Sequence, residues 1–240
     1  MGPSTITAPL TGARRAEFAL RFRECIASYP FTPRGEWLLT AYPREHADAQ
    51  RRYDALVALA QRDADITDAA IGWLLPHADT PANRTRDVWL SHAPTTASDP
   101  RAWLTQKGWV RAEEWPRVAA ALLRFVRQAT TDPAALVPAC QEFAALPDVR
   151  GFQMGMLAPI LHALRPTDYC LLTGATRAVI HHLTGQRFTA KLTDLPAANA
   201  VAWAIIAEVS DLFADPHAPA LPPSDLFDFV CQWLITVKHW

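Results

Sequence analysis

The chain has 240 residues, of which half are apolar and a fifth are charged, so its composition is that of a folded globular protein and excludes extensive disorder. The longest apolar run, 200–207, is far shorter than the roughly 18 residues of a membrane span, and the first residues lack the apolar stretch of a signal peptide. The net charge of −1, divided as +3 in residues 1–130 and −4 in residues 131–240, excludes strong non-specific binding to nucleic acid by either half.

Helical periodicity of apolar residues runs along the whole chain. One stripe extends from Phe18 to Ile26, a second follows Pro43 and extends from Ala49 to Ala60, and a third extends from Trp115 to Val126. Signals for helix ends agree with these stripes. They are Thr80 before Pro81, Asp132 before Pro133, Asp194 or Leu195 before Pro196, Ser224 before Asp225, and Gly185 as a terminating residue. The best strand-like stretch, 169–172, is short.

These patterns predict an all-α fold of roughly nine or ten helices. We expect one compact multi-helix domain over residues 1–240, or two helical lobes with a seam near residues 94–100. The apolar face from Phe227 to Ile235 continues almost to Trp240. We interpret this segment either as a helix that docks on the core or as a boundary beyond which a longer protein continues.

Sequence motifs for catalysis, metal binding and cofactor binding are lacking. The chain has no P-loop, no GxGxxG, no GxSxG and no HExxH. His181 and His182 are adjacent and point in different directions on a helix, while Asp225 and Asp228 favour the dipole in the first turn of a predicted helix. We therefore predict no catalytic residue, no metal ligand and no cofactor. The four cysteines form no CxxC pair, which favours reduced thiols and a cytoplasmic protein.

Residues 146–185 show a turn, an apolar helix, a short extended piece and a capped helix. This order resembles the core of the helix-hairpin-helix DNA glycosylases, in which a Leu-Pro-Gly-Val-Gly hairpin binds a phosphate. Leu146, Pro147 and Val149 match that hairpin, whereas Asp148 and Arg150 replace its glycines. Thr173 occupies the position of the catalytic aspartate, so the resemblance implies DNA binding without glycosylase chemistry.

A second resemblance covers residues 30–240. It rests on LLPHADTPANRTRDVWLSHAP (74–94), GWVRAEEWPRVAAALLRFV (108–126), RGFQMGMLAPILHALRP (150–166), LPAANAVAWAIIAE (195–208) and FDFVCQWLITVKHW (227–240). These segments resemble the region that precedes the AAA+ motor in bacterial McrB-like, modification-dependent restriction proteins. The resemblance implies a module that reads DNA, often at a modified cytosine, with the motor outside this chain.

Three groups of residues are candidates for DNA contact. The start of the helix at Thr173 offers backbone N–H groups to a phosphate, and the turn before 154 offers a second phosphate contact and a group that can read a base edge. The third group is a polar and aromatic patch before residue 93. The predicted DNA-binding residues are Asn83, Arg84, Arg86 and Trp89 in the patch, Arg150 and Gln153 in the turn, and Thr173, Gly174, Arg177 and His181 on the helix.

We therefore expect a non-enzymatic, cytoplasmic DNA-recognition module of a McrB-like restriction system. Its predicted partners are double-stranded DNA, methylated or unmodified, and an AAA+ motor if the chain is part of a longer protein, with no membrane partner. Two alternatives remain open. One is a divergent helix-hairpin-helix glycosylase whose carboxylate comes from elsewhere, such as Asp168. The other is a helical adaptor that binds a protein through exposed tryptophans.

Overall fold

The computed structural model describes residues 10–93 and 98–240 and confirms the all-α class. Over these residues the chain forms twelve α-helices, five short 3-10 helices and one parallel pair of two-residue strands. The α-helices are α1 (Gly12–Ser28), α2 (Pro33–Ala60), α3 (Thr67–Leu74), α4 (Pro81–Arg84), α5 (Pro100–Gln106), α6 (Trp115–Thr131), α7 (Leu136–Ala144), α8 (Met154–Leu164), α9 (Gly174–Thr184), α10 (Leu195–Glu208), α11 (Ser210–Phe213) and α12 (Pro223–Thr236). The strands are β1 (His77–Ala78) and β2 (Leu90–Ser91), and the 3-10 helices are Tyr29–Phe31, Ala112–Glu114, Pro133–Ala135, Pro147–Val149 and Leu192–Asp194.

The helix ends follow local capping chemistry at most predicted positions. The Thr80 hydroxyl accepts a hydrogen bond from the Asn83 N–H, and Gly185 ends α9 in the left-handed conformation with φ 73°. The predicted cap at Ser224 is wrong, because α12 already begins at Pro223. Ser224 is buried instead, and its hydroxyl donates to the Pro166 carbonyl at 2.6 Å.

Helix α2 continues through Pro43 and reaches 28 residues. Ahead of the predicted stripe its inward face is partly polar: Tyr42 and Glu45 are buried and His46 is half-buried, at successive positions on one side of the helix. Pro43 itself is exposed. The helix therefore carries a row of hydrogen-bonding groups into the interior.

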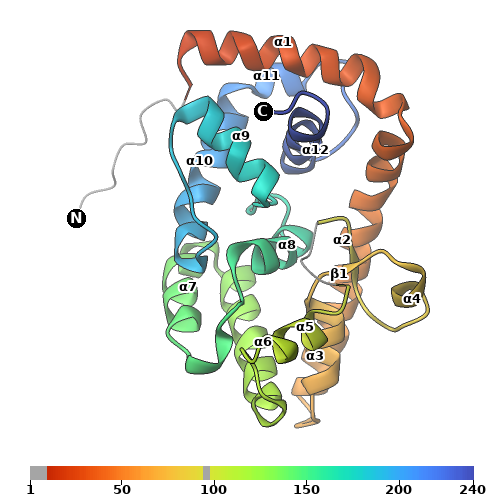
Figure 1. Cartoon of the computed structure of the whole chain (residues 1–240), viewed down its shortest axis with the longest axis vertical. Coiled ribbons are helices and arrows are strands. Elements are labelled where there is room, and N and C mark those ends of the chain that lie inside the picture. Colours follow the sequence, from red (N-terminus) through yellow and green to blue (C-terminus); the bar gives the residue numbers. More distant parts are fainter. Residues whose placement is uncertain (1–9, 94–97) are drawn as a thin grey trace.

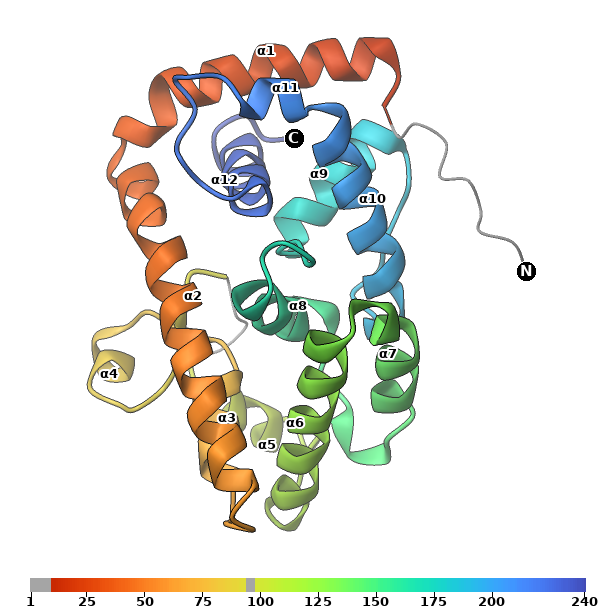
Figure 2. The ribbon, with the colours of Figure 1, turned by 180° about the vertical axis from the view of Figure 1, so that it is seen from behind.

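The helices surround a central element, α8, in which ten of eleven residues are buried (Figures 1 and 2). Helix α1 crosses one end of the molecule and packs on α9 and α12, while α2 follows one side and packs on α3 and α8. Buried apolar side chains from α1, α12 and most of the helices between them form one continuous hydrophobic core. The predicted seam near 94–100 falls mainly on residues 94–97, which lie outside the described residues.

Two details of the predicted elements are wrong. Residues 169–172 are buried but form no strand, and side chains bind part of their backbone instead: the Cys170 N–H donates to Asn199 Oδ1 at 2.8 Å, and the Leu171 carbonyl accepts from the Thr176 hydroxyl. The strands lie at 77–78 and 90–91, where His77 pairs with Leu90 and Ala78 with Ser91. The predicted number of nine or ten helices is lower than the twelve α-helices of the described residues, partly because α4 and α11 have only four residues each.

The four cysteines are free and buried. A search of residues 10–93 and 98–240 finds no helix with both the length and the apolar character required to cross a membrane.

Gly35 permits the close approach of α2 to the segment before it. A Cβ atom at this position would lie 1.8 Å from the carbonyl oxygen of Tyr29. We expect Gly35→Ala to lower the free energy of unfolding by about 3 kcal/mol or more, because neither backbone can move without disturbing the core. Gly155→Ala is the control, since its Cβ meets nothing within 4 Å, and it should change stability by less than about 1 kcal/mol. Urea unfolding measures both, and equal stability of the two variants would contradict this role of Gly35.

Candidate functional site

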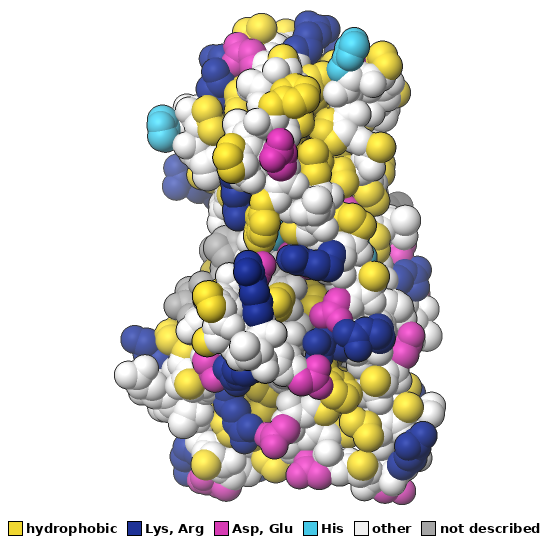
Figure 3. Space-filling view, turned by 90° about the vertical axis from the view of Figure 1, so that its right-hand side faces the viewer, with side chains coloured by type: hydrophobic (Ala, Val, Ile, Leu, Met, Phe, Trp, Pro, Cys, Tyr) yellow, Lys and Arg dark blue, Asp and Glu magenta, His cyan; other side chains and the backbone are white. Residues whose placement is uncertain are grey.

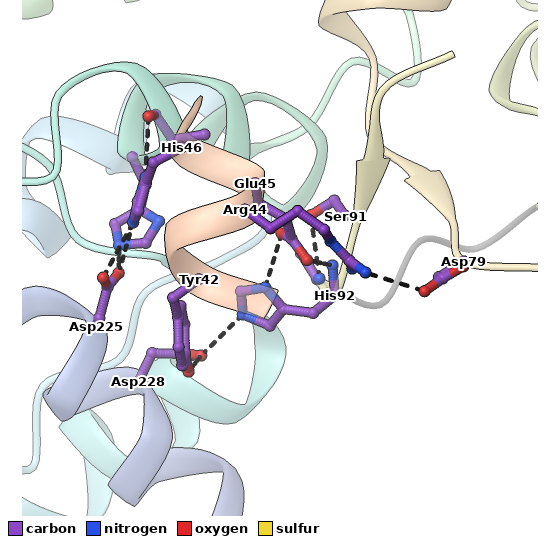
Figure 4. A network of polar contacts seen from close by, with 12 residues as sticks. Tyr42, Arg44, Glu45, His46, Asp79, Ser91, His92, Asp225 and Asp228 are labelled. Carbon is purple, nitrogen blue, oxygen red and sulfur yellow. Dashed lines mark hydrogen bonds and ion pairs between the residues drawn. The ribbon is translucent and has the colours of Figure 1, made fainter. Parts of the chain in front are cut away.

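The first turn of α12 places two carboxylates in the interior. Asp225 and Asp228 are each 1% exposed, because this turn faces α2 and α8 rather than solvent (Figure 4). The interpretation of these residues as acids that only favour the helix dipole is therefore wrong. Buried carboxylates require hydrogen-bonding or charged partners, and each of the two has its own set.

Asp228 is held by α2, α9 and the loop after β2. The Tyr42 hydroxyl donates to its Oδ2 at 2.7 Å, and His92 Nε2 lies 3.3 Å from the same oxygen. The hydroxyl of Thr176, which is fully buried, lies 3.3 Å from Oδ1 and 2.6 Å from the Leu171 carbonyl. The Asp228 side chain thus contacts three segments of the chain.

His92 bridges two carboxylates. Its Nδ1 lies 2.8 Å from Glu45 Oε2, its Nε2 faces Asp228, and its backbone N–H donates to Glu45 Oε1 at 2.8 Å. Because both ring nitrogens face acceptors, the imidazolium form is favoured. Burial lowers the pKa of His92, but the two carboxylates outweigh this effect and raise the pKa to about 10.

Asp225 is held by two histidines. His46 Nε2 lies 3.1 and 3.0 Å from its two oxygens, and His162 Nε2 lies 2.9 Å from Oδ1. Burial raises the pKa of Asp225, but the two imidazoles outweigh burial and hold this pKa at about 2. Burial lowers the pKa of His46, but the neighbouring carboxylate leaves it raised overall. This pair of imidazoles around one carboxylate is a potential metal site.

A small cavity and a larger groove adjoin these groups. The cavity has room for about one water molecule and is lined by Tyr42, Glu45, His46, Trp89, Ser91, His92, Pro159, His162, Ala163 and Leu171. The groove has a volume of about 640 Å³ and is lined by Pro33, Arg34, Trp37, Ala78, Asp79, Arg84, Ser91, His92 and Ala93. We call it the α2–α4 groove. Ser91 and His92 line both spaces, so the cavity and the groove adjoin at these two residues.

The predicted patch at 83–89 divides between the interior and the surface. Trp89 is 1% exposed and Asn83 is 2% exposed, and the Asn83 amide donates to the carbonyls of Ala78 and Ser98. Neither of these two side chains faces solvent. Arg84 and Arg86 are exposed, with Arg84 Nε 2.6 Å from Asp79 and Arg86 Nη1 3.0 Å from Asp99.

The predicted turn before α8 is on the surface. Arg150 and Gln153 are exposed, and the Arg150 guanidinium lies 5.9 Å from the ring centre of Trp109. Gly151 has φ 96°, a conformation suited to glycine. The structure places this turn outside the lining of the α2–α4 groove.

The chain's own groups make contacts at the start of α9, the predicted anion site. The Thr173 hydroxyl, which is 2% exposed, accepts the Thr176 N–H as a cap. Arg177 Nε donates to the Thr173 carbonyl at 3.3 Å, and burial lowers its pKa. Gly174 is exposed, and His181 is half-buried and lines a different pocket beside Trp240. Of the predicted DNA-binding residues, Arg84 alone is among those that line the α2–α4 groove.

Sequence reasoning missed the residues that the structure brings together. His46, His92 and His162 come from separate segments, so no local motif identifies them. Glu45 and His46 do stand at helical spacing between Tyr42 and Ala49, which is a detectable signal of a polar row on a buried face. Arg34 and Trp37 also carry a signal, since they are three residues apart after the exposed Phe31.

Comparison with known proteins identifies no relative: no family model, no curated sequence and no solved structure matches this chain.

His92 makes stability depend on pH. The groups that face it are Glu45, Asp228, Tyr42 and Trp37. Because its pKa is raised above the ordinary 6.5, the folded state holds a proton that the unfolded state loses as pH rises. The stabilisation is complete below about pH 6.5 and should decline toward pH 10, by at most about 1.4 kcal/mol per pH unit.

Urea unfolding at a series of pH values measures this effect. His92→Gln should be less stable at neutral pH and should show a flatter decline between pH 6.5 and 10 than the wild type. The difference between the two curves removes the contribution of other groups that titrate in this range. Parallel curves would contradict a protonated His92.

Proposed function

We propose that this protein binds DNA through the α2–α4 groove, with phosphates on Arg34 and Arg84 and a base against Trp37. The observation that carries the proposal is the combination of guanidinium groups and an aromatic ring in one groove. The Arg34 guanidinium lies 4.3 Å from the centre of the Trp37 ring, and Arg84 lines the same groove. Arg84 is the residue that this site shares with the sequence-based prediction.

The charge of the groove favours an anionic ligand. Asp79 is the only carboxylate among its described lining residues, and its side chain is 7% exposed. Arg84 and Arg44 both face Asp79, at 2.6 and 3.6 Å. Arg34 has no carboxylate partner within 4.0 Å among residues 10–93 and 98–240. A guanidinium suits phosphate because it offers several N–H donors in a planar fork.

The surrounding surface is consistent with this assignment. The face that carries α2 and α4 shows Lys and Arg side chains across its middle, with acidic side chains between them (Figure 3). Phe31, just before α2, is 76% exposed. Alternating basic and aromatic groups bind nucleic acid by ion pairing and base stacking, and the size of the groove is within the usual range of ligand pockets.

The resemblance of residues 30–240 to McrB-like recognition regions extends the proposal. It suggests that the bound DNA carries a modified cytosine and that an AAA+ motor is the partner. A protein that draws one base out of the duplex gains much of its selectivity from the pocket rather than from phosphate contacts. This makes a groove of modest charge compatible with binding.

Fluorescence anisotropy with short labelled oligonucleotides tests the proposal. The ligands are an unmodified duplex, duplexes with 5-methylcytosine or 5-hydroxymethylcytosine, and a single strand, each at low and moderate salt. Arg34→Ala combined with Arg84→Ala should raise the Kd at least about tenfold, because a charge-assisted hydrogen bond contributes about 1.5 kcal/mol or more. The salt dependence of binding should also become less steep.

Arg124→Ala combined with Arg127→Ala is the matched control. Both residues are exposed on α6, outside the groove, and their loss removes the same charge. The proposal requires this control to bind nearly as the wild type. Equal weakening of both double variants would indicate non-specific electrostatic binding. No binding by the wild type at low salt would refute the proposal and favour a protein adaptor.

A further inference from the structure

His46, His162 and Asp225 bring three metal-ligating side chains from three helices to one point. One ligand atom of each lies within 4.8 Å of the others. The side chains are 18%, 3% and 1% exposed, respectively. A carboxylate with two imidazoles is a ligand set typical of divalent transition metals.

The hydrogen bond that His46 makes through Nδ1 leaves its Nε2 available to bind a cation. Its Nδ1 lies 2.9 Å from the Ala163 carbonyl oxygen, which can only accept, so Nδ1 carries a hydrogen. In the neutral ring Nε2 then has a lone pair, and this lone pair faces both oxygens of Asp225. A hydrogen, on Nε2 or on the carboxyl group, or a metal ion must lie between them. A backbone carbonyl that orients the far ring nitrogen is the usual support of a metal-binding histidine.

His162 favours the metal ion over the proton. Its Nε2 is buried and only 2.9 Å from Asp225 Oδ1, yet it makes no hydrogen bond. A buried N–H without an aligned acceptor is destabilising and rare. A lone pair on Nε2, by contrast, could bind a cation, and because the ligand atoms of His46, His162 and Asp225 lie within 4.8 Å of one another, one cation among them would satisfy all three groups.

We propose that His46, His162 and Asp225 bind one divalent transition-metal ion, of which Zn²⁺ is the best-suited example. With bonds of about 2.0–2.1 Å in a tetrahedral site, ligand atoms lie roughly 3.3 Å apart. The observed separations of 2.9–3.1 Å from Asp225 require only a small outward adjustment. Both histidines also line the cavity that has room for about one water molecule, which gives the fourth ligand a place.

This arrangement has the pattern of an open site rather than a closed structural one. Structural zinc sites usually have four protein ligands, whereas sites that bind a reactive water have three. Glu45 lines the same cavity, and its carboxylate pairs with His92 rather than with the three proposed ligands. The argument for this site does not rest on the proposed DNA binding, because His46, His162 and Asp225 are not among the residues that line the α2–α4 groove.

Metal titration of the untagged protein tests the proposal. After removal of metals with a chelator, Zn²⁺ is added in calorimetry and in thermal unfolding. We expect about one equivalent to bind and the Tm to rise with Zn²⁺ concentration. Co²⁺ is the second probe, and it should give the visible absorption of a four-coordinate ion without a thiolate charge-transfer band.

His46→Gln should weaken Zn²⁺ binding at least about 100-fold, because loss of a direct ligand exceeds the effect of losing a supporting group. His182→Gln is the matched control: His182 Nε2 lies 3.1 Å from Glu17 Oε1, a histidine–carboxylate pair elsewhere in the fold. The control should bind Zn²⁺ as the wild type does. Circular dichroism verifies that both variants are folded.

Three results would overturn the proposal. They are failure of the wild type to bind about one equivalent, equal affinities of folded His46→Gln and the wild type, and a thiolate band in the Co²⁺ spectrum. If His46→Gln does not fold, the Co²⁺ spectrum of the wild type decides, because it reports the ligand set directly. A proton shared among the three side chains would produce the first of these results.

Discussion

Asp225 and Asp228 bring two carboxyl groups into the interior, and the packing of α12 depends on the partners that satisfy them. Loss of one partner of a buried charge destabilises a protein by about 3–5 kcal/mol, so the positions of these partners are strongly constrained. The partners come from separate segments: Tyr42 and His46 from α2, His162 from α8, Thr176 from α9 and His92 from the loop after β2. The apolar core supplies the driving force for folding, while these polar contacts select the register in which the helices meet.

The start of α9 illustrates the same constraint. A helix N-terminus with a threonine cap is suited to an anion, and the sequence predicts a DNA phosphate there. In the folded chain Thr173 caps its own helix, and the Thr176 hydroxyl lies 3.3 Å from the Asp228 carboxylate. The anion nearest to this hydroxyl is therefore internal. The local chemistry was predictable, but the direction in which the helix start faces depends on α12, more than forty residues later.

The sequence predicts what depends on neighbouring residues and fails where distant segments meet. The stripes at Phe18–Ile26 and Trp115–Val126, the Thr80 cap and the Gly185 end follow from helical spacing and local backbone preferences. In the sequence Asp225 is typical of an acid at a helix start. In the folded chain α2 and α8 place His46 and His162 beside it. Likewise Trp89 looks available for stacking, but its ring is buried against α2, where its indole N–H faces the Glu45 carbonyl at 3.4 Å.

One turn of α2 connects the two proposed sites. Arg44 faces outward toward Asp79, while Glu45 and His46 face inward. Glu45 holds both the ring and the backbone N–H of His92, which lines the α2–α4 groove and the cavity. A cation on His46 would therefore add positive charge behind the wall of a groove that attracts anions. If the ion strengthens DNA binding, linkage requires DNA to strengthen ion binding by the same factor. Glu45 and His46 are adjacent on α2, and Glu45 pairs with His92, which gives that coupling a short physical route.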